Sequence, residues 1–342
     1  MSMKLCITGG GTGGHLAIAK AVAKAANEMG IECIYIGSTS GQDRKYFEHS
    51  PLFSKKFFLP TTGIVDKKGF AKFKALWLVL KAFVRSVRIL KKEKVNAVFS
   101  VGGFSAAPAS FAAIVLGIPL FIHEQNAKTG RLNALLRKYS AGFFSSYDDA
   151  SPLKNYPVQD RFFDLSRKRG KIKSIVFLGG SQGAKAINDL ALDVAHELKN
   201  RGIHIIHQTG ERDFERVKEA YEKMGIDAEI YAFTDNIAEL MHKADLAVSR
   251  AGASTLWELS ANALPALFIP YPYAAGDHQY FNAKHLADNE LGWLKRENEH
   301  PKEQLLQILN EDLSKKSEAL VGLSKEGAAK EILNYIVKKV AT

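Results

Sequence analysis

The stretch "MKLCITGGGTGGHLAIAKAV", residues 3–22, decides the fold class of this chain. It begins with apolar, β-prone residues, five of the six positions 9–14 are glycine, and an apolar helical pattern follows. A strand, a glycine turn and a helix in that order place backbone N–H groups and a helix N-terminus where they can bind an anion such as a diphosphate. The stretch therefore predicts an α/β domain that binds a phosphorylated ligand.

The same order of elements recurs along the whole chain. In the first half, short β-rich runs alternate with helical patterns: "IECIYIG", "NAVFSVGG", "PLFIHEQN" and "AGFFSS". A second series begins at "FLGGSQGAKAINDLA", residues 177–191, and continues through "IHIIHQTG", "AEIYAF", "DLAVSR" and "PALFIP". Alternation of this kind is typical of βαβ units in a parallel sheet. We therefore predict two Rossmann-like, doubly wound parallel-sheet domains facing a cleft, which suggests an enzyme that uses a nucleoside diphosphate.

Length and local composition suggest where the domains end. The 342 residues exceed what one hydrophobic core usually serves. A polar, proline-containing and charged stretch near the middle predicts a linker over residues 156–170. The expected domains are therefore residues 1–155, which include the first glycine turn, and residues 171–325. A C-terminal helix is expected over residues 326–342, and its return to the first domain is one possible arrangement.

An uncharged stretch over residues 98–122 is long enough to span a bilayer. Its glycines and prolines divide it into strand, loop, short helix, turn and strand, so we expect it to form the core of a parallel sheet. Cys6 and Cys33 are the only cysteines, and no basic, apolar leader precedes Lys4. These features favour a reducing cytoplasm.

The glycine turn alone does not identify the nucleotide. Gly9, Gly11 and Gly14 match the dinucleotide spacing, but the second strand ends in "YIGSTSG", without an acid for a ribose diol. A P-loop would need Gly-Lys-Ser/Thr, whereas His15 and Leu16 follow the glycines. Because no Asp-x-Asp pair follows a strand, we expect neither a metal-held diphosphate nor a cofactor.

Five motifs occur in one order across both predicted domains. They are "TGGGTGGH" at 8–15, "HEQN" at 123–126, "GGSQGA" at 179–184, "SRAGASTLWEL" at 249–259 and "DHQYFNA" at 277–283. On these motifs the chain resembles the MurG family, the peptidoglycan N-acetylglucosaminyltransferases of the GT-B fold. The resemblance implies inverting transfer of N-acetylglucosamine from UDP-GlcNAc to lipid I, the undecaprenyl-pyrophosphoryl-muramoyl-pentapeptide, giving lipid II. A UDP-sugar epimerase or hydrolase of the same architecture, without a lipid acceptor, is the alternative.

The resemblance also implies where UDP-GlcNAc, a substrate, is bound. Glu258 is placed at the ribose, where a carboxylate can accept hydrogen bonds from both hydroxyls of a diol. Gln279 is placed at the N-acetylglucosamine, and Ser181 lies in the second glycine turn. The full set of expected binding residues is Thr12, Gly13, Gly14, Asn126, Ser181, Ala253, Ser254, Thr255, Glu258 and Gln279. We expect Ser254 or Thr255 to open a helix whose N–H groups meet the diphosphate.

Catalysis needs a base for the acceptor hydroxyl, and the sequence offers two. His15 is the first candidate, because an imidazole titrates near neutral pH. Glu124 in "HEQN" is the alternative base. Two positions depart from the family pattern: Phe104 stands where a tyrosine is common, and Gln159 stands where many members have arginine.

Positive charge is concentrated in the first half of the chain. Residues 1–160 hold 22 Lys and Arg against 10 Asp and Glu, whereas the remainder holds 25 against 26. Within residues 66–94, aromatic residues lie among lysines, a pattern that suits an anionic membrane surface. The residues expected to face that surface are Phe70, Phe73, Trp77, Lys67, Lys68, Lys72 and Lys74. Leu76, Leu80, Phe83, Val87 and Leu90 also recur at helical spacing and are expected in the core.

These patterns also bear on partners and location. Base-stacking aromatics and a nucleic-acid reader fold are not evident, so we expect no nucleic-acid partner. The resemblance implies lipid I and an anionic membrane as partners, with other cell-wall synthesis proteins as further candidates. It also implies a peripheral location on the cytoplasmic face of the bacterial inner membrane.

Overall fold

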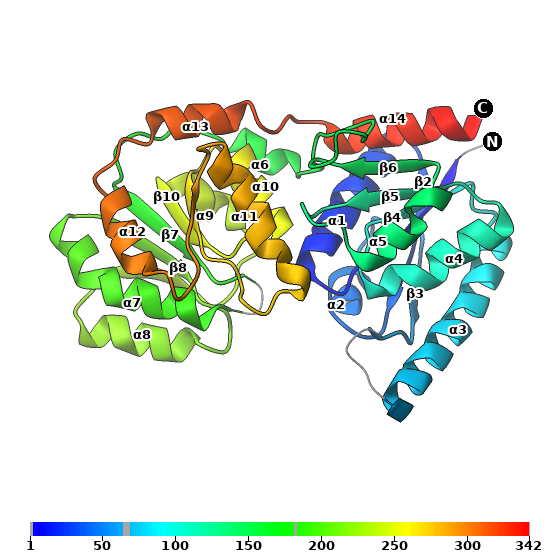
Figure 1. Cartoon of the computed structure of the whole chain (residues 1–342), viewed down its shortest axis with the longest axis horizontal. Helices are drawn as coiled ribbons and strands as arrows, with labels where there is room; N and C mark the ends of the chain where they lie inside the picture. The colour runs from blue at the N-terminus through cyan, green and yellow to red at the C-terminus, as the bar shows by residue number, and fades with distance from the viewer. Residues whose placement is uncertain (1–2, 64–68, 181–182, 342) are drawn as a thin grey trace. The chain divides into compact units, whose positions relative to one another are not determined.

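The computed structural model describes residues 3–63, 69–180 and 183–341, and within this range the side chains of residues 70–72 are not described. The chain forms two compact units, one of residues 1–158 with 327–342 and one of residues 159–326. Each unit contains one six-stranded sheet in which every strand pair is parallel (Figure 1). The expected fold class, two Rossmann-like domains of the GT-B type, is confirmed.

The first unit has the strand order β3-β2-β1-β4-β5-β6. Its strands are β1 (Lys4–Thr8), β2 (Glu32–Ser38), β3 (Lys55–Leu59), β4 (Ala97–Ser100), β5 (Leu120–Glu124) and β6 (Gly142–Ser145). Its helices are α1 (Gly13–Glu28), α2 (Asp43–Phe47), α3 (Gly69–Lys92), α4 (Ala107–Leu116), α5 (Arg131–Leu136) and α14 (Ala328–Ala341). The C-terminal helix α14 packs on α1, where Lys330 Nζ lies 2.9 Å from Glu28 Oε2. The end of the chain is therefore part of the first unit (Figure 1).

The second unit has the strand order β12-β11-β10-β7-β8-β9. Its strands are β7 (Ser174–Leu178), β8 (His204–Gln208), β9 (Ala228–Tyr231), β10 (Leu246–Ser249), β11 (Ala266–Phe268) and β12 (Trp293–Leu294). Its helices are α6 (Asp160–Asp164), α7 (Lys185–Asn200), α8 (Phe214–Lys223), α9 (Ile237–Lys243), α10 (Ala253–Ala261), α11 (His278–Asp288), α12 (Pro301–Ile308) and α13 (Ser314–Val321). The strand order reverses between β1 and β4 in the first sheet and between β7 and β10 in the second. Folds of this kind bind ligands at the carboxyl ends of the strands at this point.

The uncharged stretch 98–122 forms sheet core, as the sequence predicts. It contains most of β4, a 3₁₀ turn at Phe104–Ala106, α4 and the start of β5. Val98 and Ile122 are fully buried in one hydrophobic cluster with Ala109 of α4. Among the described residues, no helix has both the length and the apolar character needed to cross a bilayer.

Helix α3 differs from its expected packing. Leu76 and Leu80 were expected in the core, but 57% of each is exposed. The buried positions of this helix include Ala75, Ala82 and Leu90, and the helix packs closely against α4. Small residues at a helix contact allow the two helices to approach closely, so the leucines turn outward instead. The expectation for Leu76 and Leu80 was therefore wrong.

Candidate active site

The first glycine turn follows β1 and lies against the turn that follows β4. Gly10 N donates to Gly102 O at 3.1 Å, and a Cβ on Gly9 would lie 2.4 Å from the same oxygen. Only glycine permits this approach, and Gly9 also has a φ of +110°. Gly11 N donates to the buried carboxylate of Asp43 at 2.5 Å. Both N–H groups already donate within the protein. A phosphate at this turn would therefore be bound by the N–H groups at the start of α1 rather than by those of Gly10 or Gly11.

His15 lies in the first turn of α1, beside the glycine turn. Its Nδ1 is 2.8 Å from the hydroxyl oxygen of the exposed Thr12. In the tautomer that carries its proton on Nδ1, the ring donates to Thr12 and Nε2 carries the lone pair that can accept a proton. A methyl group on Gly102 would lie 3.5 Å from Nε2, so this nitrogen sits over the bare backbone that follows β4.

Glu124 ends β5, and its own loop surrounds its carboxylate. Oε1 accepts from Asn126 N at 3.0 Å and from Asn126 Nδ2 at 3.4 Å. Oε2 accepts from Gly130 N and from Asn133 Nδ2, both at 2.9 Å. With 2% of its surface exposed, Glu124 holds the loop that carries Asn126. The geometry therefore favours His15 over Glu124 as the base.

The motif around α10 builds a second candidate site after β10. Gly252 precedes the helix and Ala253 begins it, so Ser254 and Thr255 lie inside the first turn rather than opening the helix as expected. Ser254 Oγ donates to Glu258 Oε1 at 2.7 Å. Burial raises the pKa of the Glu258 carboxyl, and the bond from Ser254 opposes this shift. The carboxylate is therefore fixed one turn beyond the helix N-terminus.

Gln279 lies in the first turn of α11. Its Oε1 accepts from Tyr271 N at 3.0 Å, which directs the amide donors away from that backbone. Asp277, in the left-handed conformation at φ +57°, precedes the helix and pairs with Arg296 at 2.6 Å. Ser181, expected in the second glycine turn, lies outside the described residues.

The structure groups the expected residues by unit. Thr12, Gly13, Gly14, His15, Glu124 and Asn126 gather at the carboxyl ends of β1 and β5 in the first unit. Ala253, Ser254, Thr255 and Glu258 follow β10 in the second unit, and Gln279 follows its neighbour β11. Each unit thus presents backbone N–H groups and polar side chains at the edge where parallel sheets bind ligands.

Comparison with known proteins identifies the family. Residues 5–145 match the glycosyltransferase family 28 N-terminal domain, and residues 174–336 match the family 28 C-terminal domain. The crystal structure of Acinetobacter baumannii MurG is similar with a TM-score of 0.79 and 26% identity, covering 99% of this chain and 100% of that one. A Sulfurimonas denitrificans protein named UDP-N-acetylglucosamine--N-acetylmuramyl-(pentapeptide) pyrophosphoryl-undecaprenol N-acetylglucosamine transferase is 60% identical over 98% of both chains. The chain belongs to the MurG family. A Wolinella succinogenes protein of the same name is 54% identical over 98% of this chain and 100% of its own.

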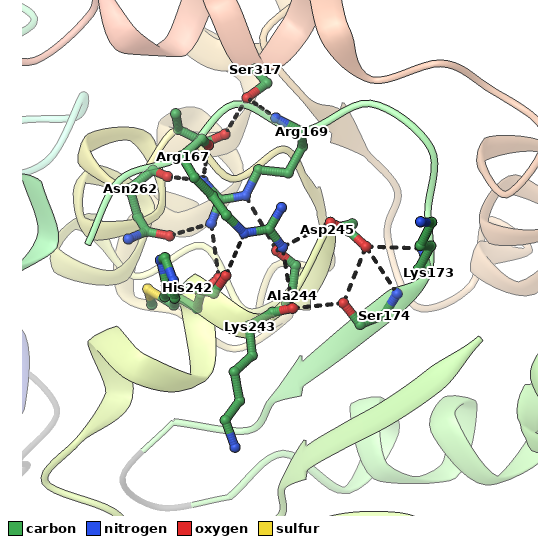
Figure 2. Close-up of polar contacts among 12 residues, drawn as sticks. Arg167, Arg169, Lys173, Ser174, His242, Lys243, Ala244, Asp245, Asn262 and Ser317 are labelled. Atoms are coloured by element: carbon green, nitrogen blue, oxygen red, sulfur yellow. Dashed lines mark hydrogen bonds and ion pairs between the residues drawn. The ribbon is translucent and has the colours of Figure 1, made fainter.

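This MurG-family chain also contains a buried arginine that the sequence analysis missed. Arg169, 2% exposed, donates to the carbonyl of Ala244 at 3.2 Å and to Oδ1 of Asn262 at 2.6 Å (Figure 2). It donates to the carbonyl of Met241 at 3.0 Å as well. It also donates to the carbonyls of Asn262 and Arg167. Burial, followed by repulsion from Arg167, lowers the pKa of Arg169 to about 9.

Arg169 therefore caps two helices at once. Met241 lies in the last turn of α9 and Asn262 directly follows α10. A cation satisfies the carbonyls at a helix C-terminus and interacts favourably with its dipole. The end of α10 opposite Ala253 and Ser254 is thus anchored to the segment that leads into β7.

A neighbouring ion pair anchors the same segment. Arg167 Nη2 lies 2.8 Å from Asp245 Oδ1 (Figure 2). The second oxygen of Asp245 accepts from Lys173 N at 2.9 Å and from Ser174 N at 3.1 Å. These contacts fix the entry to β7 against the start of β10.

Proposed function

We propose that this chain transfers N-acetylglucosamine, with inversion, from UDP-GlcNAc to the muramoyl sugar of lipid I, giving lipid II in peptidoglycan synthesis. The observation that carries the proposal is the 60% identity, across both units, with a relative named for this transfer. The site geometry supports the same reaction, because the first unit offers a base and the second offers a carboxylate and a helix N-terminus.

His15 is the base in this proposal. Nε2 takes the proton of the acceptor hydroxyl while that oxygen forms the new bond to the anomeric carbon of the donor sugar. The bond between that carbon and the UDP oxygen breaks, and UDP leaves with its electron pair. Thr12 accepts from the Nδ1–H of this tautomer, in which Nε2 carries the lone pair.

The second unit binds the donor in this proposal. The N–H groups of Ala253, Ser254 and Thr255 meet the diphosphate and stabilise the charge that develops as UDP leaves. Glu258 accepts hydrogen bonds from the ribose hydroxyls, and Ser254 fixes its carboxylate. The amide of Gln279 donates to the donor sugar.

Replacing Glu258 with alanine is expected to raise the KM for UDP-GlcNAc about 10- to 100-fold. The reason is that the ribose hydroxyls lose a charged partner, at a cost of roughly 1.5–3 kcal/mol. Initial rates at varied donor concentration measure the change. The control is Glu303→Ala, because Glu303 is an exposed carboxylate on α12 of the same unit. A donor KM within twofold of the unmodified protein would remove Glu258 from the site.

The apolar face of α3 supports a membrane partner. We define this face by five exposed side chains: Phe73, Leu76, Trp77, Leu80 and Val84, which are 40–68% exposed. Lys81 Nζ lies 3.4 Å above the Trp77 ring, and Lys74 is exposed beside it. Such a face, flanked by lysines, fits an anionic bilayer surface. We propose that it holds the enzyme at the cytoplasmic face of the inner membrane, where lipid I is its acceptor.

Other members of the expected membrane set are not described. Lys67 and Lys68 lie outside the described residues. Phe70 and Lys72 belong to α3, but their side chains are not described. Their part in membrane binding stays a prediction.

The double substitution Phe73→Ser with Trp77→Ser is expected to weaken binding to anionic vesicles about 30-fold. The two rings are 68% and 48% exposed, so the insertion of each contributes roughly 1 kcal/mol. Replacing Lys67, Lys68, Lys72 and Lys74 with glutamine should instead make the remaining binding less sensitive to salt. Vesicle sedimentation measures both effects, and Val321→Ser on α13 is the control with similar exposure. Unchanged sedimentation of both variants would show that α3 only covers the sheet.

Acceptor dependence tests the proposed reaction. The purified protein should release UDP from UDP-GlcNAc only when lipid I, or a short-chain soluble analogue, is present. Conversion of UDP-GlcNAc to free sugar or to an epimer without any acceptor would support the hydrolase or epimerase alternative instead.

A further inference from the structure

Asn133, in α5, is a buried amide whose orientation is fixed at one end. It is 5% exposed, and its Nδ2 donates to Glu124 Oε2 at 2.9 Å. A carboxylate only accepts hydrogen bonds, so the nitrogen of the amide must face Glu124. Oδ1 must therefore face the other way.

The other end of the amide lacks a partner. Among the described residues, Asn133 Oδ1 is buried without a hydrogen bond. Buried polar atoms are nearly always paired, so an unpaired one calls for an explanation. Since Glu124 holds this amide in place, the unpaired oxygen is a fixed feature of the site.

Asn133 and His15 converge on one point. A methyl group on Gly102 would lie 3.4 Å from Asn133 Oδ1, 3.0 Å from Asn133 Nδ2 and 3.5 Å from His15 Nε2. Gly102 has a φ of +85°, which glycine adopts readily. Both side chains therefore border the space that the absent side chain of Gly102 leaves open.

Two titratable groups of the same unit, His123 and Asp43, are accounted for by their own surroundings. His123 of β5 is 1% exposed, and burial, followed by the charge of His15, lowers the pKa of His123 to about 3. It is therefore neutral at physiological pH. Asp43 of α2 is engaged by Gly11 N and Ser38 N. Glu124 accepts from Asn133 Nδ2 and is therefore the carboxylate linked to this amide.

We propose that Asn133 is a positioning residue for His15, holding Oδ1 where it accepts a hydrogen bond from Nε2–H once His15 has taken the acceptor proton. Glu124 supports this contact by fixing the amide. The inference rests on the proposed function for its catalytic meaning, because it assumes that His15 is the base. The contact itself can be measured without turnover.

The test is the pKa of His15, followed by NMR of the histidine ring in the full-length protein and assigned with His15→Gln. Asn133→Leu removes the acceptor and should lower the pKa of His15 by about one unit, because the charged ring loses a hydrogen bond. Asn126→Leu is the matched control. Asn126 also donates to Glu124 but to Oε1, so its loss should leave the pKa of His15 unchanged.

Kinetics separate a positioning role from a merely structural one. In Asn133→Leu, kcat should fall about tenfold with an unchanged donor KM, and the acidic limb of the pH profile should move to lower pH with the pKa of His15. A pKa of His15 unchanged in Asn133→Leu, or shifted equally by Asn126→Leu, would overturn the proposal. The proposal would also be overturned if the pKa of His15 shifted in Asn133→Leu while the acidic limb of its pH–rate profile stayed at the same pH.

A second variant covers the case in which Asn133→Leu does not fold. Glu124→Gln keeps the shape of the side chain but frees the Asn133 amide to turn, so it should also lower the pKa of His15. No shift in that variant would overturn the proposal. The proposed function is tested by a different measurement. If the unmodified protein transferred no sugar, the proposed function would be wrong, but the pKa of His15 measured by NMR would still test the contact with Asn133.

Discussion

Replacing His15 with alanine is expected to lower kcat by ~10²–10⁴, the range typical of losing a general base. UDP affinity should be nearly unchanged, because Nε2 acts on the acceptor hydroxyl and the proposed donor-binding residues Glu258 and Gln279 lie in the other unit. Steady-state rates with a soluble acceptor, together with direct titration of UDP, measure the two effects separately.

Two controls accompany this prediction. Imidazole added to His15→Ala should restore part of the rate, since it can enter the space the ring occupied. His15→Gln should bind UDP as the unmodified protein does. A kcat within tenfold of the unmodified enzyme in His15→Ala, or a far larger loss in Glu124→Ala, would reverse the roles that the geometry favours.

Replacing Arg169 with methionine is expected to lower the free energy of unfolding of the second unit by about 3–5 kcal/mol. Methionine fills much of the space but removes the arginine donor from both oxygens of Asn262, and it leaves the carbonyls of Met241 and Ala244 with one donor each instead of two. Urea unfolding followed by tryptophan fluorescence measures the change. Trp257 and Trp293 lie in the second unit, so a Trp77→Phe background removes the signal of the first.

Arg161→Met is the matched control for this prediction. Arg161 pairs with Glu239 at 2.7 Å on the surface of the same unit, with 42% of its side chain exposed. Such exposed pairs contribute less than about 1 kcal/mol. If Arg169→Met unfolded at the same urea concentration as Arg161→Met, the capping of α9 and α10 would contribute little to stability.

The central strands of both sheets and one edge strand of each, β6 and β9, were predicted from the sequence, whereas the opposite edge strands, β3 and β12, were not. β1 and β7 are apolar runs followed directly by glycine, and β4, β5 and β10 are apolar runs that end in serine or glutamate, a strong local pattern. β3, "KKFFL", begins with two lysines, and β12 has only two residues. An edge strand that is very short or begins with charged residues is defined mainly by its partner, so its own residues carry a weak signal.

Residues of the candidate site could be predicted from the sequence where they belong to one contiguous motif. Asp43, Asn133 and Arg169 were missed because their roles depend on partners distant in the sequence. Arg169 reaches Asn262 across 93 positions, and Asp43 reaches Gly11 across 32. One local hint existed, since Asn133 interrupts the apolar run "LNALL". An isolated polar residue in such a run is a signal for a buried hydrogen bond.

The central claim is that the sugar of UDP-GlcNAc is transferred to a lipid-linked acceptor. The measurement that tests it most directly follows radiolabel from UDP-GlcNAc in the presence of lipid I and anionic vesicles. The label should enter a butanol-extractable lipid, and NMR of that product should show an anomeric configuration inverted relative to the donor. Label that stays in the aqueous phase, as UDP-sugar, free N-acetylglucosamine or an epimer, would contradict the account.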